Sequence, residues 1–130
     1  MSKKVLIVDD DPDVRLFTKT VIEELGYEPI EADNGEDGQK RLQENPPDLI
    51  ILDVLMPRQS GIRLYRVIKT DKKFKNIPVL ILSGIAKKSF LRSQKALAEF
   101  GDVEVPEPDA YLEKPVDPDQ LAEVVKSLLG

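Results

Sequence analysis

The 130 residues fit one domain of ordinary size, and we expect residues 1–130 to form a single domain. No cysteine and no histidine is present, which excludes a disulfide framework, a cysteine zinc site and any role as a phosphohistidine donor. The net charge of −5 argues against nucleic acid as a direct partner, and no apolar run approaches the roughly 20 residues of a membrane-spanning helix. The N-terminus lacks a signal-peptide pattern, so the expected location is the cytoplasm.

The first half of the chain alternates short apolar runs with amphipathic stretches. Val5–Val8 is continuously apolar, which is typical of a strand buried on both faces of a parallel sheet. Asp11-Pro12 predicts a helix start, with aspartate as the N-cap and proline in the first turn. Tyr27–Ala32 predicts a strand at the sheet edge, because its proline lacks the N–H that a central strand needs. Gly35–Asn45 predicts a short helix.

The second half of the chain repeats this alternation. Its expected elements are, in chain order, a strand over Leu49–Leu52, a helix capped by Ser60 and running to about Asp71, a strand over Val79–Leu82, a helix over Lys87–Phe100, a strand over Ala110–Leu112 and a closing helix that begins at Asp117-Pro118. Residues 102–109 are rich in acid and proline, so no packed element is expected there. Five strand–helix units predict a doubly wound α/β domain, with a parallel sheet between two helical layers.

Charged or hydroxyl side chains stand at the ends of four expected strands: Asp9-Asp10 after the first, Asp53 after the third, Ser83 after the fourth and Lys114 after the fifth. Parallel strands bring their carboxyl ends to one edge of the sheet, where such folds bind ligands. Helix capping does not explain the acids, because Asp11 already fills the cap and Asp53 does not directly precede a helix. A single serine or lysine at the end of a strand often has only a structural role. The evidence for a functional site is that the acids, the serine and the lysine all stand at the ends of strands of the same sheet.

Three carboxylates at one place need a counter-charge. Like charges about 4 Å apart repel by about 4 kcal/mol at an effective dielectric of about 20, a large part of a folding free energy of about 5–15 kcal/mol. A divalent cation removes this repulsion, and an all-oxygen site with few carboxylates suits Mg²⁺. The cation also makes a carboxylate a usable phosphoryl acceptor, while Lys114 and the Ser83 hydroxyl can hold the remaining phosphoryl oxygens. The residues therefore predict a Mg²⁺-dependent phosphoryl acceptor among these carboxylates.

A family resemblance rests on four segments: VLIVDDDPDVR at 5–15, IILDVLMPRQSG at 50–61, VLILSG at 79–84 and YLEKPVD at 111–117. With them, essentially the whole chain resembles a receiver domain of the two-component response regulator family. The resemblance implies a flavodoxin-like (βα)5 three-layer fold with strand order 2-1-3-4-5. It also implies a phosphorylation-activated signalling switch, which catalyses only its own phosphorylation and dephosphorylation and is not otherwise an enzyme.

The resemblance further implies a role for each strand-end residue. Asp53 is the expected phospho-acceptor, and Ser83 and Lys114 are the expected contacts of the phosphoryl group. Tyr111 is the expected aromatic switch, which moves together with Ser83, and the peptide bond before Pro115 is expected to be cis. The expected phosphoryl donor is a phosphohistidine on a sensor histidine kinase or on a histidine phosphotransfer protein.

For the cation, the resemblance implies a site made mainly of carboxylates. The expected ligands of Mg²⁺ are Asp10, Asp53 and the backbone carbonyl of Leu55, with Asp9 assisting through water. Leu55 and Ile85 occupy the two positions that, in the family, flank the path of the water that hydrolyses the acyl phosphate. Both are apolar here, so we predict slow self-dephosphorylation. The alternative is that the two side chains only extend the core.

The segment before the last expected strand is longer than usual for the family, with the excess near residues 102–109. The preceding helix carries a basic stripe formed by Lys87, Lys88, Arg92 and Lys95. Such a stripe is often only a solvated surface. A functional interpretation assigns the 87–112 face to an acid-bearing downstream partner or to self-dimerisation.

Three alternatives differ in class from a phosphorylated switch. A pseudo-receiver that binds partners without phosphorylation is disfavoured, because the acids, hydroxyl and lysine are all present. A phosphohydrolase of the haloacid dehalogenase type needs a second acid two residues after the nucleophile, where this chain has Leu55. A P-loop nucleotide binder needs a G-x-x-x-x-G-K stretch, which the sequence lacks. No output domain is expected after the closing helix, so the domain is a free-standing regulator, a phosphorelay carrier or a piece of a longer protein.

Overall fold

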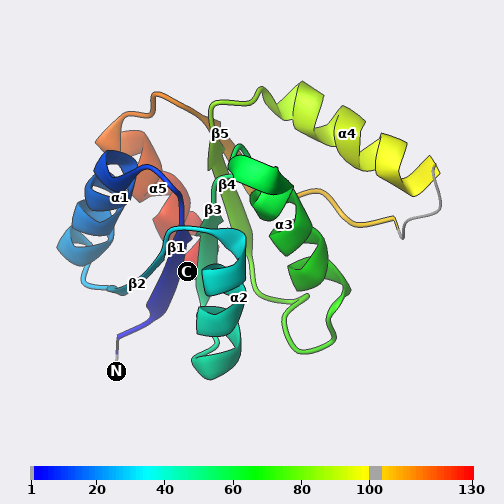
Figure 1. Ribbon diagram of the computed structural model, residues 1–130. Helices are drawn as coiled ribbons and strands as arrows, with labels where there is room; N and C mark the ends of the chain where they lie inside the picture. The colour runs from blue at the N-terminus through cyan, green and yellow to red at the C-terminus, as the bar shows by residue number, and fades with distance from the viewer. Residues whose placement is uncertain (1, 100–103) are drawn as a thin grey trace.

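A computed structural model describes residues 2–99 and 104–130 of the chain. Five parallel strands form one sheet in the order β2-β1-β3-β4-β5, and helices cover both of its faces (Figure 1). The elements are, in chain order, β1 (Lys4–Val8), α1 (Pro12–Glu24), β2 (Glu28–Ala32), α2 (Gly35–Glu44), β3 (Leu49–Leu52), the 3-10 turn η1 (Pro57–Gln59), α3 (Ser60–Thr70), β4 (Val79–Ser83), α4 (Lys87–Glu99), β5 (Ala110–Glu113) and α5 (Pro118–Leu129). The predicted doubly wound flavodoxin-like fold and its strand order are confirmed.

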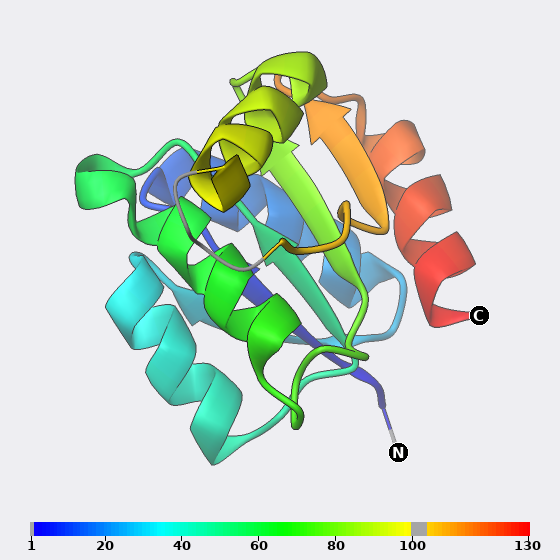
Figure 2. The same ribbon diagram turned by 90° about the vertical axis from the view of Figure 1, so that its right-hand side faces the viewer.

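Alternate residues of the central strands pack into two separate apolar cores. In β1, Leu6 and Val8 join the core under α2, α3 and α4, whereas Val5 and Ile7 join the core under α1 and α5 (Figure 2). These four side chains are at most 1% exposed. Burial on both faces explains why the strand is a continuous apolar run. It also leaves the carboxyl ends of the strands as the place where polar groups can gather.

Of the three predicted helix caps, two are confirmed and one is not. Asp11 Oδ1 accepts hydrogen bonds from the N–H groups of Asp13 and Val14 at 2.9 and 3.3 Å, and Asp117 caps α5 in a similar way. The predicted cap role of Ser60 is wrong. The turn η1 runs directly into α3, so Ser60 has helical angles (φ −64°, ψ −31°), whereas an N-cap needs extended backbone.

In the described part of the chain, the remaining element boundaries differ from the predictions by about one residue at most. In the described strands, β2 lies at an edge of the sheet, as its proline predicts. The predicted helix over Lys87–Phe100 is observed to Glu99, and Phe100 lies outside the described residues. Residues 104–109 contain no helix or strand, as expected, and residues 102–103 lie outside the described part. The last strand is one residue longer than predicted, because Glu113 pairs with Ser83.

Candidate functional site

The predicted site residues meet at the carboxyl edge of the sheet. β1 and β3 pair in register up to their last residues, so Asp9 and Asp53, which follow these strands, lie side by side. Ser83 ends β4, and Lys114 follows β5, which pairs with β4. Lys114 Nζ donates a hydrogen bond to Asp9 Oδ2 at 2.9 Å and a second to Asp53 Oδ2 at 3.3 Å. The lysine therefore joins the ends of three strands.

Asp9, Asp10 and Asp53 form an acidic cluster, in which one carboxylate oxygen of each lies within 4.8 Å of the others. The side chains of Asp9 and Asp53 are each 4% exposed, while Asp10 is exposed. Burial raises the pKa of Asp9 above its usual value, although hydrogen bonds from Lys114 and the Asp11 N–H act against this. In formal charges, three carboxylates and one lysine leave a net charge of two negative units at the cluster. The charge and the all-oxygen donors fit a divalent cation such as Mg²⁺.

Lys114 lies among charges of the opposite sign, and its side chain is 22% exposed. Burial by itself lowers the pKa of an ammonium group. The hydrogen bond to Asp9 and the negative charges of Asp53 and Asp9 outweigh this effect and raise the pKa of Lys114 above its usual value. The amine therefore stays protonated at neutral pH and acts as a charged hydrogen-bond donor.

Backbone N–H groups orient the two buried carboxylates. Asp53 Oδ1 accepts a hydrogen bond from the Leu55 N–H at 2.8 Å, and Asp9 Oδ1 accepts one from the Asp11 N–H at 2.9 Å. The second oxygen of each carboxylate contacts Lys114. Each carboxylate is thus held at both oxygens, which fixes its plane. The Leu55 carbonyl as a metal ligand stays a prediction.

Two hydrogen bonds connect Ser83 to Tyr111 through the backbone of Ile85. Ser83 is fully buried, and its Oγ accepts a hydrogen bond from the Ile85 N–H at 3.3 Å. The Tyr111 hydroxyl donates to the Ile85 carbonyl at 2.5 Å. Burial, together with the negative charges of Glu113 and Asp53, raises the pKa of Tyr111 to about 12. The hydroxyl is therefore a donor at neutral pH, and both predicted switch residues share one backbone contact.

The two apolar residues predicted to limit water access differ in burial. Leu55 is 59% exposed, and its Cδ2 lies 3.9 Å from the position that a Cβ atom would take at Gly84. Ile85 is half-buried and packs against the core under α2, α3 and α4. The core-packing alternative is therefore wrong for Leu55 and holds for Ile85. Leu55 is a large apolar side chain exposed two residues after Asp53.

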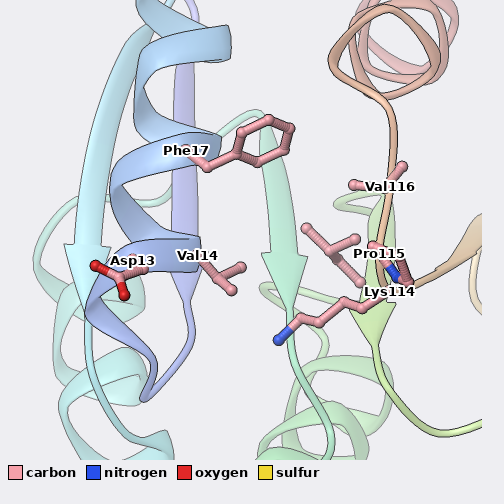
Figure 3. A pocket seen from close by; sticks show the side chains of 7 residues that line it. Asp13, Val14, Phe17, Lys114, Pro115 and Val116 are labelled. Carbon is pink, nitrogen blue, oxygen red and sulfur yellow. The ribbon is translucent and has the colours of Figure 1, made fainter.

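An apolar groove beside Lys114 was not predicted from the sequence. A cavity of about 420 Å³ lies between α1 and the β5–α5 loop, and the residues that line it are Asp13, Val14, Phe17, Leu82, Lys114, Pro115 and Val116. Figure 3 shows Val14 and Phe17 of α1 facing Pro115 and Val116 across this groove. The Lys114-Pro115 peptide bond is cis, as predicted. Val14 and Phe17 follow the helical apolar spacing of α1, which by itself indicates only a core contact.

Comparison with known proteins agrees with this geometry. The family model described as "Response regulator receiver domain" matches residues 5–126. The chain belongs to this family. It is 32% identical to the polar-differentiation response regulator DivK of Brucella anthropi, over 100% of this chain and 98% of that protein.

Solved structures of the family are also similar to this one. A putative response regulator from Chloroflexus aurantiacus has a TM-score of 0.80 at 32% identity, covering 99% of this chain and 98% of that chain. The chemotaxis response regulator CheY4 of Vibrio cholerae has a TM-score of 0.81 at 26% identity, covering 99% of this chain and all of that chain. The family resemblance and the fold that it implies are thus confirmed.

Family membership supports a phosphorylation-regulated signalling role. Receiver domains are signalling modules rather than classical enzymes, and they interact with histidine kinases or phosphotransfer proteins. They bind Mg²⁺ at an acidic pocket, and Asp9, Asp10 and Asp53 form such a pocket here. Within the described residues, no helix has the length and apolar character needed to cross a bilayer. The phosphohydrolase alternative is disfavoured by this membership, while the pseudo-receiver alternative calls for an experiment.

Proposed function

We propose that residues 1–130 form one cytoplasmic receiver domain that is phosphorylated on Asp53 and thereby changes its binding to other proteins. The phosphoryl group comes from a phosphohistidine on a sensor histidine kinase or a histidine phosphotransfer protein. The observation that carries the proposal is the acidic cluster of Asp9, Asp10 and Asp53, with Lys114 bonded to two of its members. Asp10, Asp53 and the Leu55 carbonyl would hold Mg²⁺, with Asp9 assisting through water.

The residues of this chain have distinct parts in the transfer. Asp53 Oδ1 keeps its hydrogen bond from the Leu55 backbone N–H, whereas the partner of Oδ2 is the Lys114 side chain, which can transfer to the phosphoryl group, so Oδ2 is the oxygen that attacks phosphorus. A bond forms from Oδ2 to phosphorus, and the phosphorus–nitrogen bond breaks, with its electron pair leaving on the donor's imidazole nitrogen. Lys114 moves its hydrogen bond from the free carboxylate to a phosphoryl oxygen. When bound, Mg²⁺ neutralises charge on the phosphoryl oxygens.

Ser83 and Tyr111 transmit the change to the surface. The Ser83 Oγ accepts a hydrogen bond from Ile85, so its own hydrogen is available for a phosphoryl oxygen. When Ser83 turns toward the phosphoryl group, the Ile85 N–H loses this acceptor. Tyr111 is bonded to the carbonyl of the same residue, so the two movements are coupled.

The apolar groove between α1 and the β5–α5 loop is the proposed binding surface for the protein that donates the phosphoryl group. Asp53 is 4% exposed, so a donor imidazole reaches it only if the donor protein covers the surrounding surface. The groove supplies apolar contact area on that surface, with Phe17 on one side and Val116 on the other. A helix carrying the phosphohistidine suits a groove of this kind, because an apolar helical face can pack into it.

The decisive experiment is phosphorylation with acetyl phosphate and Mg²⁺, followed by intact-protein mass spectrometry. We expect one phosphoryl group on the wild type, none on Asp53→Asn, and one on the control Asp33→Asn, which changes an exposed aspartate in the loop before α2. Chelation of the metal should also prevent the modification. Mg²⁺ binding without any phosphorylation would favour the pseudo-receiver alternative.

The apolar side chains beside the acceptor lead us to propose a long-lived phosphoryl group. Neither Leu55 nor Ile85 can orient a water molecule by hydrogen bonding, and the Leu55 side chain is 59% exposed two residues after Asp53. Leu55→Asn should therefore speed the loss of phosphate from the phosphorylated domain. Leu16→Asn is the control, because Leu16 is 61% exposed on α1. A wild-type phosphoryl lifetime of seconds would contradict the proposal.

The basic stripe of α4 leads us to propose that the 87–112 face binds a second copy of the chain after phosphorylation. Its four members are exposed: Lys87, Lys88, Arg92 and Lys95. The whole chain carries a net charge of −5, so the chain without the four basic residues of the stripe carries −9 and offers complementary charge on a second copy.

The double variant Lys88→Glu/Arg92→Glu should lose phosphorylation-dependent self-association in sedimentation velocity. Lys72→Glu/Lys73→Glu, on the exposed loop after α3, is the control. Self-association that survives the α4 reversal would exclude this face, and a monomeric wild type would point to an acid-bearing partner instead.

A further inference from the structure

Arg15 connects the acidic cluster to the edge strand β2. Its Nη1 donates a hydrogen bond to the backbone carbonyl of Asp9 at 2.8 Å. Its Nε lies 3.7 Å from Glu31 Oε1 on β2, and the same glutamate lies 3.6 Å from Lys19 Nζ. The Arg15 side chain is only 20% exposed. The guanidinium therefore bridges the acidic loop and the sheet from a largely buried position.

The carbonyl that Arg15 contacts belongs to the peptide unit between Asp9 and Asp10. The carboxylates of Asp9 and Asp53 are each held by Lys114 and by a backbone N–H. In residues 2–99 and 104–130, no hydrogen bond or ion pair to the exposed Asp10 carboxylate is found. The position of Asp10 therefore depends on its backbone, and Arg15 is the side chain that holds the peptide before it.

The charge of Arg15 and its hydrogen bond to the Asp9 carbonyl predict opposite effects on Mg²⁺ affinity. A positive charge near a divalent-cation site repels the cation, so as a charge alone Arg15 weakens Mg²⁺ binding. As a rigid, planar donor it restricts the Asp9–Asp10 peptide and reduces the cost of ordering Asp10 when the cation binds. Residues that orient metal ligands from outside typically change metal affinity by 10–100-fold. The sign of the effect of removing Arg15 therefore tells which role dominates.

We propose that Arg15, held in place by Glu31, is a positioning residue for Asp10 and that its net effect is to strengthen Mg²⁺ binding. The inference rests on the proposed function, because it concerns the same acidic cluster. Arg15 acts through the Asp9 carbonyl and does not itself contact the phosphoryl group. Glu31 contributes by fixing the guanidinium against β2.

The test compares Arg15→Gln with Lys19→Gln by calorimetric Mg²⁺ titration of the unphosphorylated chain. Lys19 is the matched control, because it contacts Glu31 but makes no hydrogen bond to the Asp9 carbonyl in the described structure. We expect Arg15→Gln to weaken Mg²⁺ binding by about tenfold or more. Lys19→Gln should bind as tightly as the wild type, or slightly more tightly because a positive charge is lost. Arg15→Lys, which keeps the charge but loses the planar fork, should also bind more weakly.

A metal-free measurement separates positioning from general loss of structure. In the amide NMR spectrum without Mg²⁺, Arg15→Gln should shift the signals of Asp10 and Asp11 while signals of β4 and β5 stay in place. Equal or tighter Mg²⁺ binding by Arg15→Gln would overturn the positioning role and leave the proposed function intact. Mg²⁺ binding by neither the wild type nor the variants would instead contradict the proposed function, and the positioning role with it.

Discussion

The acidic edge at β1 and β3 and the region under α4 hold their side chains by different means. At the acidic edge, Asp9 and Asp53 are fixed by directional hydrogen bonds from backbone N–H groups and Lys114. Under α4, ring packing dominates: the Tyr65 and Phe90 rings are 5.3 Å apart at 83°, and the Phe90 and Tyr111 rings are 5.8 Å apart at 48°. Directional bonds require one geometry, whereas apolar contacts tolerate a shift of the helix.

The region under α4 is also less completely bonded. Gln94 Oε1 accepts a hydrogen bond from Arg66 at 2.7 Å, but its buried Nε2 has no partner among the described residues. The 104–109 segment, which leads from the α4 side into β5 (Figure 2), contacts α3 through the Tyr65 hydroxyl and the Pro106 carbonyl at 2.5 Å. An unpaired buried donor costs free energy. The comparison sets an edge fixed by directional hydrogen bonds beside a helix held mainly by ring packing.

Phe90→Ala should have the largest effect on stability and should separate the two regions. Phe90 is 1% exposed and lies between the rings of Tyr65 and Tyr111. We expect the free energy of unfolding to fall by about 3–5 kcal/mol, because the substitution leaves a cavity. Mg²⁺ affinity, measured by calorimetry on the folded variant, should remain that of the wild type. A large loss of Mg²⁺ affinity would show that the acidic edge depends on α4.

Gly61→Ala should damage the acidic edge itself. A Cβ atom at this position would lie 2.2 Å from the Asp53 carbonyl oxygen and 2.7 Å from the Val54 Cα. The backbone of Asp53 would have to move, so we expect a loss of about 1–3 kcal/mol in urea unfolding and weaker Mg²⁺ binding as well. Gly84→Ala is the control, because its Cβ would meet only Leu55 Cδ2 at 3.9 Å. Equal effects of the two variants would contradict this explanation.

Tyr65→Phe should have a smaller effect, confined to the region under α4. The substitution keeps the ring against Phe90 and removes the hydrogen bond to Pro106. The expected loss is about 1 kcal/mol in the free energy of unfolding. Hydrogen exchange should increase in 104–109 and leave β1 and β3 unchanged. Tyr27→Phe, on the opposite face of the sheet, is the control.

Alkaline pH should weaken the two regions through different groups. Burial raises the pKa of Tyr65 and raises that of Tyr111 to about 12, so between about pH 10 and 12 the folded state keeps protons that the unfolded state loses. The free energy of unfolding therefore falls as pH rises through this window. Tyr111→Phe should reduce that fall, as measured by urea unfolding from neutral pH to about pH 11.

The raised pKa of Lys114 gives stability that is present below about pH 10.5 and is lost above its folded pKa. The part of the fall that remains after both Tyr→Phe changes is expected to come from the acidic edge. If Tyr111→Phe leaves the pH dependence of the free energy of unfolding unchanged, the tyrosine contribution is contradicted.

The acidic edge could be predicted from the sequence because its residues directly follow the strands. A strand buried on both faces is visible as an apolar run, and its end places the next side chain at the sheet edge. Asp53 and Lys114 were therefore placed without knowledge of any contact. The edge position of β2, which contains Pro29, followed from a similar local rule, because a proline lacks the N–H that a central strand needs.

The contacts that the sequence did not predict join residues of separate elements through backbone atoms. Arg15 on α1 binds the Asp9 carbonyl, and Tyr65 on α3 binds the carbonyl of Pro106. A backbone carbonyl is present at every residue, so no side-chain pattern indicates which one an arginine or tyrosine reaches. Ser60 failed as a cap for a related reason, since the conformation of the turn before it decides whether its backbone is helical.

By itself, the sequence determined where the strands lie and which acids, hydroxyl and lysine stand at their ends. It could do so because apolar periodicity and strand ends are local properties of the chain. Only the tertiary structure decided that Leu55 is exposed while Ile85 packs against the core, that Lys114 bonds to both Asp9 and Asp53, and that Arg15 bonds to the Asp9 carbonyl. The physical reason is that these facts depend on distances between elements, which arise only when the two helical layers pack onto the sheet.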